Sequence, residues 1–184
     1  MKPFIIFFLS ILIMIQATSS QTLIKSTCKT SVANDPTISY NFCTTSLQAA
    51  PASRCATVAG LGSISIRLVR YNITDTRCHV KQLLQNKTLS PYVKQCLDDC
   101  FELYSDAILS VKQAMRHYNA KQFDDANVQI SSVMDASTTC EGGFADGKVV
   151  SPLSKRNNDT SQLSAIALSV VRIVQTGSSK SSLT

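Results

Sequence analysis

The sequence predicts an all-α protein: an up-down-up-down four-helix bundle, preceded by an N-terminal helical hairpin and stapled by disulfides. Three observations support this prediction. Only 6 Gly and 5 Pro occur among 184 residues, which argues against a turn-rich β protein and against long disordered tails. Four long segments place apolar residues three and four positions apart, the spacing of amphipathic helices. The chain contains seven cysteines, and their spacing along the sequence suits disulfides between antiparallel helices.

The first twenty residues have the pattern of a secretory signal peptide. Lys2 precedes a run of 12 residues, 4–15, which is apolar except for one serine. Such a run is too short to span a bilayer and suits the hydrophobic core of a signal peptide. Small residues follow it and fit a cleavage site near residue 20. We therefore expect residues 1–20 to be removed and the mature protein to be secreted, without a membrane anchor.

A helical hairpin is expected over residues 21–50, directly after the signal peptide. Its two helical segments are predicted at 23–33 and 38–49. Asn34-Asp35-Pro36 separates them, and these residue types favour a turn.

The bundle is predicted over residues 51–177. Its first helix is expected at about 52–84, on an apolar stripe that consists of Val58, Leu61, Ile64, Leu68 and Tyr71. The second helix, over 92–118, has the most regular pattern, with apolar residues at Val93, Leu97, Cys100, Tyr104, Ala107, Val111, Ala114 and Tyr118. Ser90 and Pro91 precede it as an N-cap and a first helical residue.

The third and fourth bundle helices are delimited by polar and glycine signals. The third is expected to begin at Phe123 and to end at Gly142-Gly143, because glycine favours helix termination. The fourth is expected to follow the N-cap-like Asn157-Asn158-Asp159 and to end at Gly177. Residues 178–184 are rich in serine and are predicted to form a frayed tail.

Two cysteine pairs fit the predicted helix connections. In antiparallel helices, residues equally far from the connecting loop lie side by side. Cys100 and Cys140 are equally far from residue 120, which lies in the loop between the second and third bundle helices. Cys28 and Cys43 are centred on the turn of the hairpin in the same way. Both pairs are therefore predicted to be disulfides, with pairs of buried thiols as the alternative.

The remaining three cysteines are less constrained. Cys78 and Cys96 are centred on the connection 86–90 between the first two bundle helices, so a third bridge is plausible by the same argument. Cys55 is then left over and is expected to be a buried or half-buried free thiol. An exposed Cys55 would instead raise the alternative of a disulfide-linked dimer.

No catalytic, metal or cofactor site is predicted. The nucleophile, zinc-protease, phosphate-loop and dinucleotide motifs are all absent, and the two histidines, His79 and His117, have no second cysteine pair at ligand spacing. The acidic residues Asp98, Asp99, Glu102 and Asp106 are best explained as a solvated helix face. Basic residues are scattered along the chain, which argues against a nucleic-acid partner. A secreted protein that binds another protein or a small ligand is favoured.

Three N-glycosylation sequons are present. They begin at Asn72, Asn86 and Asn158, and each has a non-proline middle residue and a threonine. All three are candidate glycosylation sites in a secreted protein.

Several segments together resemble the plant invertase and pectin methylesterase inhibitor family. They are Thr27-Cys28, Tyr40-Asn41-Phe42-Cys43, Leu97-Asp98-Asp99-Cys100 with Tyr104 and Asp106-Ala107, and Thr139-Cys140-Glu141 with Phe144. The resemblance covers essentially the whole mature chain. Within the family it is greatest to an invertase-inhibitor branch that includes a plane-tree pollen allergen. It implies two disulfides, Cys28–Cys43 and Cys100–Cys140. It also implies secretion to the plant cell wall (the apoplast).

The resemblance further implies an inhibitor that binds its target enzyme 1:1 and blocks the active-site cleft. In members that act on pectin methylesterase, the Thr-Cys-Glu motif, here Thr139 to Glu141, would lie near the contact. Invertase inhibitors instead insert a Pro-Lys-Phe loop that lies between the second and third bundle helices. At that place this chain has Lys121-Gln122-Phe123, so only Phe123 of the motif is retained. Phe123 also fits a plain role as the first core residue of its helix.

Pectin methylesterase is therefore narrowly favoured as the target, and acid invertase, in the cell wall or vacuole, is the alternative. A non-inhibitory secreted bundle, such as a ligand carrier or a signalling protein, is the alternative of another class. A carrier needs a lined cavity, whereas the apolar spacing predicts a filled core.

Overall fold

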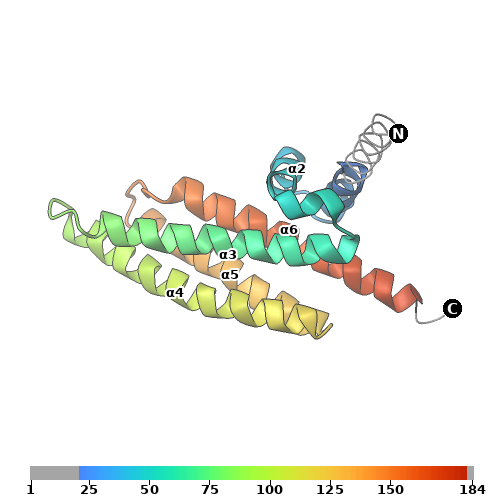
Figure 1. The fold of residues 1–184 in the computed structure, drawn as a ribbon. Helices are drawn as coiled ribbons and strands as arrows, with labels where there is room; N and C mark the ends of the chain where they lie inside the picture. Colours follow the sequence, from blue (N-terminus) through green and yellow to red (C-terminus); the bar gives the residue numbers. More distant parts are fainter. Residues whose placement is uncertain (1–20, 182–184) are drawn as a thin grey trace, which may run out of the picture.

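The computed structural model describes residues 21–181, and side chains through residue 178; the predicted signal peptide and the last three residues lie outside it. The regular secondary structure of the described residues is entirely helical, with no strand, and turns connect the helices (Figure 1). Residues 21–34 form the first helix. The elements that follow are α2 (Tyr40–Ala49), the short 3₁₀ helix η1 (Pro51–Cys55), α3 (Val58–Leu83), α4 (Pro91–Asn119), α5 (Phe123–Asp146) and α6 (Ser154–Ser181).

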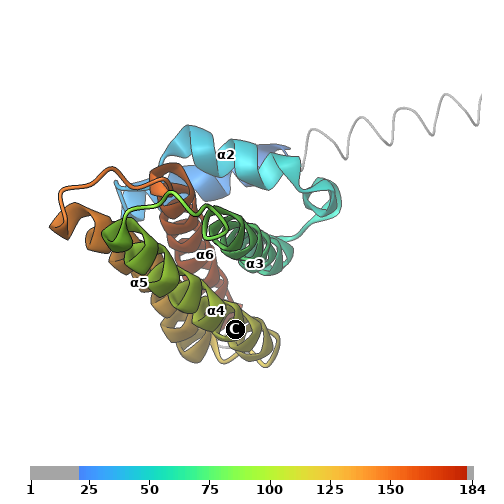
Figure 2. The same ribbon diagram turned by 90° about the vertical axis from the view of Figure 1, so that its left-hand side faces the viewer.

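The four long helices α3 to α6 form the predicted up-down-up-down bundle. Each packs against two neighbours: α4 lies between α3 and α5, and α6 lies between α5 and α3. The N-terminal hairpin lies against α3 and α6, outside the bundle (Figures 1 and 2). The sequence-based fold class is therefore confirmed.

Side-chain caps mark where two of the bundle helices, α3 and α4, begin. The Ser90 hydroxyl accepts a hydrogen bond from the Val93 amide (3.3 Å) and Pro91 occupies the first turn of α4, as predicted. The first bundle helix differs from the prediction because it is interrupted after η1. There the Thr57 hydroxyl accepts a hydrogen bond from the Gly60 amide (3.1 Å), so α3 begins at Val58.

Three predicted helix boundaries are wrong: the end of α5 and both ends of α6. Gly142-Gly143 does not end α5, which continues to Asp146. The continuation is stabilised by Phe144, which is buried in the core, and by the Tyr92 hydroxyl, which donates to the Gly143 carbonyl (2.7 Å). Gly177 likewise lies inside α6, and α6 begins at Ser154 rather than after an Asn157 cap, because Asn157 is buried and packs inward.

The core consists of two adjoining apolar clusters. The larger lies between α3, α4, α5 and α6, and the predicted α4 positions from Leu97 to Tyr118 are all buried in it. The smaller lies under the hairpin, where Ile24, Leu47 and their neighbours pack against Ile166 and Val170 of α6. One predicted core residue is misplaced: Tyr71 on α3 is 73 % exposed.

Two of the three predicted disulfides are present. Cys28 is bonded to Cys43 and Cys100 to Cys140. The predicted Cys78–Cys96 bridge is wrong, since both residues are free thiols. Cys78 lies exposed on α3, whereas the buried Cys96 lies 3.5 Å from the Gly143 carbonyl oxygen of α5. Distance from the loop predicts height along the bundle but not the direction in which a side chain points.

Cys55 also departs from the expectation. It is a free thiol, as predicted, but it is exposed rather than buried. It lies at the end of η1, whose only buried residue is Ser53.

Candidate functional site

The residues predicted to contact a target lie toward opposite ends of α5. Thr139 is exposed near the C-terminal end, and Lys121 to Phe123 open the N-terminal end. With a rise of about 1.5 Å per residue, Thr139 lies on the order of 25 Å along the helix from this loop. The two groups therefore form separate surfaces.

A buried polar network lies behind the Thr139 end of α5. The Tyr104 hydroxyl donates to Asn157 Oδ1 (2.6 Å) and lies 3.2 Å from Thr160 Oγ1. Thr160 Oγ1 in turn donates to Asn72 Oδ1 (2.6 Å). The network thus joins α3, α4 and α6 inside the bundle. Burial is the main reason that the pKa of Tyr104 is raised to about 12, so the hydroxyl remains a neutral donor.

Glu141 connects this network to α5. Its carboxylate accepts hydrogen bonds from Asn157 Nδ2 (2.6 Å) and from the Ser154 hydroxyl. Partial burial raises the pKa of Glu141, but hydrogen bonds from Ser154, Asn157 and Ser151 outweigh it, so the pKa is lowered overall. The sequence predicted Glu141 as a residue that contacts the target. In the structure, its carboxylate is bonded to residues of α6 and so positions the end of α5.

Thr139 lines a groove between α4 and α5. The groove has a volume of about 350 Å³, and the disulfide and Cys96 also line it. Asp99 of α4 and Asp146 of α5 line it as well, and the Thr139 hydroxyl makes no hydrogen bond to any described residue. This side of the bundle therefore offers a hydroxyl and two carboxylates on a covalently fixed base. The sequence indicates Asp99 only as part of a solvated helix face and does not single out Asp146, because only the packing of α4 on α5 places both beside Thr139.

The loop at the other end of α5 is closed onto α4. Lys121 adopts a left-handed conformation (φ 59°), and its amide donates to the Tyr118 carbonyl (3.0 Å). The Gln122 side chain lies 2.9 Å from His117 Nδ1. The half-buried Phe123 ring packs edge-on against Tyr118, with centroids 5.6 Å apart. Phe123 therefore serves as a core residue here and does not protrude.

Tyr118 is itself anchored to α3. Its hydroxyl donates to the Ala59 carbonyl (2.7 Å), and burial raises its pKa to about 12. Gly62 makes room for the ring, since a Cβ at that position would overlap the hydroxyl.

Two arginines share one face of α3 with Asp75, a grouping that the scattered basic residues of the sequence do not indicate. Arg67, Arg70 and Tyr71 line an open groove of about 670 Å³ along the outer face of α3. Arg70 and Tyr71 lie three and four residues after Arg67, so the helix brings both beside it.

The three sequons differ in accessibility. Asn86 lies exposed in the α3–α4 connection, where its Oδ1 accepts hydrogen bonds from the Thr88 amide and hydroxyl. Asn72 lies within α3 and takes part in the buried network. Asn158 is exposed on α6, but its sequon threonine, Thr160, is fully buried.

Among residues 21–181, no group of three or more metal-ligating side chains comes together. No helix in that part of the chain is long and apolar enough to cross a membrane.

Comparison with known proteins identifies the family. Residues 22–170 match the sequence profile described as plant invertase/pectin methylesterase inhibitor. The chain belongs to this family. Its members are inhibitor proteins and not catalysts, and the chain is therefore an inhibitor rather than an enzyme.

Relatives within the family are named for different targets. The chain is 38 % identical to a "Putative invertase inhibitor" of Platanus acerifolia, over 92 % of this chain and 94 % of the relative. It is 30 % identical to Pectinesterase inhibitor 12 of Arabidopsis thaliana, over 76 % and 80 % of the two chains. Cell wall / vacuolar inhibitor of fructosidase 2 of Arabidopsis thaliana is 29 % identical, over 68 % and 67 %.

Solved structures agree on the fold. The crystal structure of a pectin methylesterase inhibitor from Arabidopsis thaliana matches with a TM-score of 0.60 at 20 % identity. The matched region spans 79 % of this chain and 95 % of the chain in that structure. At this identity the likeness shows the helical architecture alone.

Proposed function

We propose that this protein is a secreted inhibitor of a plant pectin methylesterase, which it binds 1:1 so as to block the active-site cleft. The observation that carries the proposal is the exposed Thr139 beside the α4–α5 groove. There the Thr-Cys-Glu motif is fixed by the Cys100–Cys140 bridge and by the hydrogen bonds of Glu141. This is the motif that the family resemblance places near the contact with pectin methylesterase.

Rigidity supports this assignment. Binding costs conformational entropy when surface groups must be ordered, and preorganised surfaces avoid part of that cost. Thr139 lies next to a disulfide cysteine and four residues before Gly143, whose carbonyl accepts a hydrogen bond from the Tyr92 hydroxyl. A polar face on such a base fits a partner that offers hydrogen-bond donors and positive charge opposite Asp99 and Asp146.

Acid invertase is the second candidate target. It is favoured by the names of two relatives, at 38 % and 36 % identity, that are called invertase inhibitors. The geometry of the loop supports it less, since Phe123 packs on Tyr118 and Gln122 lies beside His117. Inhibition of invertase would therefore require the loop to open or other residues to make the contact.

The third reading, a carrier or signalling protein without inhibitory activity, is not favoured. The α4 positions that face the bundle interior are filled by buried side chains, so no large cavity runs along that seam. Delivery to the cell wall remains part of the proposal and depends on the predicted signal peptide at residues 1–20. Asn86 is the glycosylation site that we propose, because it alone of the three lies exposed in a loop with its threonine accessible.

The test is a titration of the purified, oxidised protein against a plant pectin methylesterase and a plant cell-wall invertase, near pH 5 and near pH 7. Pectin methylesterase activity is expected to fall at micromolar or lower inhibitor, with an end point of about one inhibitor per enzyme. Inhibition of invertase alone would shift the assignment to the second candidate. No loss of either activity at micromolar inhibitor would contradict the proposal.

Two variants locate the contact. Thr139→Arg introduces a bulky group into the groove and is expected to weaken inhibition of pectin methylesterase by about 30-fold or more, the effect of one central contact. Thr138→Arg is the matched control, because Thr138 is exposed one residue away and points to another side of α5. Equal losses in the two variants would argue against a contact at Thr139.

A further inference from the structure

The last turn of α5 carries part of the wall of the Thr139 groove. Asp146 is the final residue of α5, and it lines the groove together with Asp99 of α4. Thr139 lies before this turn, next to the disulfide cysteine Cys140. The disulfide therefore fixes Thr139 directly, whereas the residues after Gly142 depend on other contacts to stay in place.

This turn has a low intrinsic tendency to be helical. Gly142 and Gly143 lead into it, and each glycine lowers the population of a helical conformation about fivefold relative to alanine. Neither glycine is needed for a special backbone conformation, since no glycine in the described chain has a positive φ. A Cβ on Gly142 would meet no atom within 4 Å, so alanine would fit there. The glycine pair therefore favours unfolding of the turn, and something else must hold it.

Helix α4 supplies a cap for the end of α5. A helix leaves its last four carbonyl groups without donors of its own. Backbone amides of the following loop donate to two of them, at Phe144 and Ala145. The Gly143 carbonyl instead accepts a hydrogen bond from the Tyr92 hydroxyl (2.7 Å), with the Cys96 thiol 3.5 Å away. Both side chains come from α4, so the cap joins the two helices that form the groove.

The Tyr92 ring makes a second contact with the same end of α5. Gly147 follows α5 directly, and a Cβ on it would lie only 2.1 Å from Tyr92 Cε1. The ring therefore occupies the space that any other side chain at position 147 would fill. Gly147 has a φ of −82°, which any residue can adopt, so its missing side chain serves the ring and not the backbone.

We infer that Tyr92 is a positioning residue of the inhibitory surface: its hydroxyl and ring keep the last turn of α5 helical and so hold Asp146 beside Thr139. The inference rests on the proposed function, because it gives Tyr92 a role in the contact with pectin methylesterase. That role is indirect and acts through α5. When the turn unfolds, the groove loses Asp146, and the apparent affinity falls with the fraction of molecules whose turn is folded.

Backbone amide hydrogen exchange of the free protein, followed by NMR, tests the turn without any enzyme. Tyr92→Phe removes only the hydroxyl and is expected to raise the exchange rates of the amides from Phe144 to Asp146 about fivefold, the effect of one hydrogen bond. Gly147→Ala displaces the ring as well and is expected to raise them at least about tenfold. Gly177→Ala is the matched control, because a Cβ there would meet no atom within 4 Å, and it should leave these rates unchanged.

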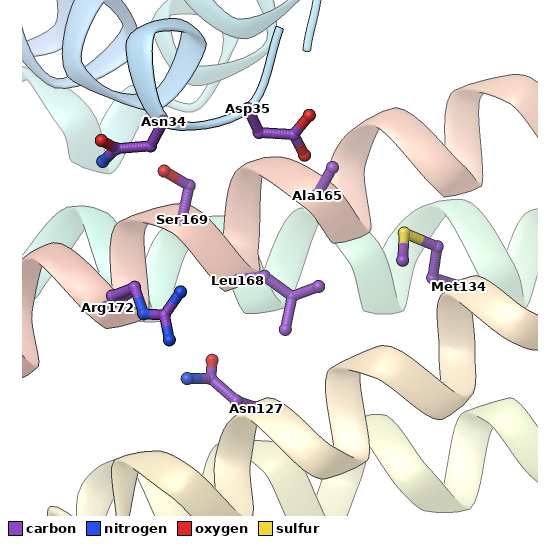
Figure 3. A pocket seen from close by; sticks show the side chains of 8 residues that line it. All are labelled: Asn34, Asp35, Asn127, Met134, Ala165, Leu168, Ser169 and Arg172. Atoms are coloured by element: carbon purple, nitrogen blue, oxygen red, sulfur yellow. The ribbon is translucent and has the colours of Figure 1, made fainter. Parts of the chain in front are cut away.

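A rescue variant and an internal reference show whether the opening is local. Gly142→Ala strengthens the helix, and its addition to Tyr92→Phe is expected to return the exchange rates of the turn to within about twofold of the parent values. The reference is the amide of Met134, at the pocket under the hairpin turn (Figure 3), more than two helical turns before Gly143. It should exchange more slowly than the turn in every variant; equal rates would mean that the whole bundle opens and would overturn the inference.

Titration against pectin methylesterase then tests the role at the surface. Gly147→Ala is expected to weaken inhibition at least about threefold, whereas Gly177→Ala should not change it. The inference is overturned if Tyr92→Phe does not alter exchange in the turn, if Gly142→Ala does not rescue it, or if Gly147→Ala inhibits as well as the parent. A parent protein that does not inhibit overturns the proposed function, and with it the role of Tyr92 in the contact; the exchange rates distinguish that case from a failure of Tyr92 to hold the turn.

Discussion

The two ends of α5 are held in the bundle by different kinds of interaction. Near its C-terminus, α5 is fixed by the Cys100–Cys140 bridge and by Glu141, which reaches a hydrogen-bond network buried between three other helices. At its N-terminus, α5 is held by the buried Ala126 and Ile130, by one aromatic pair and by hydrogen bonds that involve exposed side chains, such as Gln175 to Asp124 (2.9 Å). Covalent and buried contacts fix a surface more firmly than exposed ones, because water does not compete for their partners.

This difference bears on the choice between the two candidate contact surfaces. The Thr139 surface is preorganised by the core, whereas the 120–123 loop depends on contacts within a few residues of itself. Four changes to the protein are expected to distinguish a core-fixed from a locally fixed end, with effects that decrease from the first to the last.

Removal of the Cys100–Cys140 bridge is expected to have the largest effect on stability. The bridge closes a loop with a sequence separation of 40, for which chain entropy gives about 4 kcal/mol of stabilisation. The double substitution Cys100→Ser with Cys140→Ser is therefore expected to lower the free energy of unfolding in urea by about that amount. Removal of the hairpin bridge, with a separation of 15, is the comparison and should cost about 3 kcal/mol. A loss under about 1 kcal/mol at the bundle bridge would contradict the contrast.

Asn157→Ala tests the buried network. It leaves Glu141 and the Tyr104 hydroxyl each short of a partner, so the free energy of unfolding is expected to fall by about 2–3 kcal/mol. Asn158→Ala is the matched control, since this exposed neighbour should change stability by less than about 0.5 kcal/mol. Similar values for the two variants would show that the network contributes little.

Alkaline pH is expected to destabilise α4 more at its middle, around Tyr104, than at its C-terminal end, around Tyr118. The pKa of Tyr104 is about 12 in the folded protein and about 10 when unfolded, so the unfolded state loses its proton first. The contribution of the neutral Tyr104 hydroxyl to the free energy of unfolding is therefore fully present below about pH 10. It is lost between about pH 10 and about pH 12, and the loss amounts to about 2 kcal/mol.

Tyr118 has a similarly raised pKa but lies at the edge of the core, near the loop, so a smaller contribution is expected. Urea unfolding at several pH values, compared among the parent protein, Tyr104→Phe and Tyr118→Phe, measures the two contributions. A pH dependence that is unaffected by Tyr104→Phe would refute the assignment.

Phe123→Ala is expected to have the smallest effect of the four. The ring is half-buried and contacts Tyr118, so its removal should lower the free energy of unfolding by about 1–2 kcal/mol. Gln122→Ala, which removes only the exposed contact to His117, serves as the control and should cost less than about 0.5 kcal/mol. A loss at Phe123 as large as that at Asn157 would mean that the loop end is fixed as firmly as the other.

Local sequence signals predicted the features that depend on neighbours along the chain. The cap at Ser90, the regular α4 stripe and the heights of the two disulfides follow from helical period, capping chemistry and the distance to a loop. The same reasoning failed where packing overrides local preference. Gly142-Gly143 stays helical because Phe144 is buried beyond it, and α6 passes through Gly177.

The sequence by itself determined that the chain is helical, where most helices begin, and which cysteines stand at equal height. Only the tertiary structure decided how each helix is rotated about its axis, because that rotation minimises the exposed apolar area of all four helices together. The rotation turns Cys78 outward and Cys96 toward α5. It also joins Asn72 to Thr160, 88 residues away.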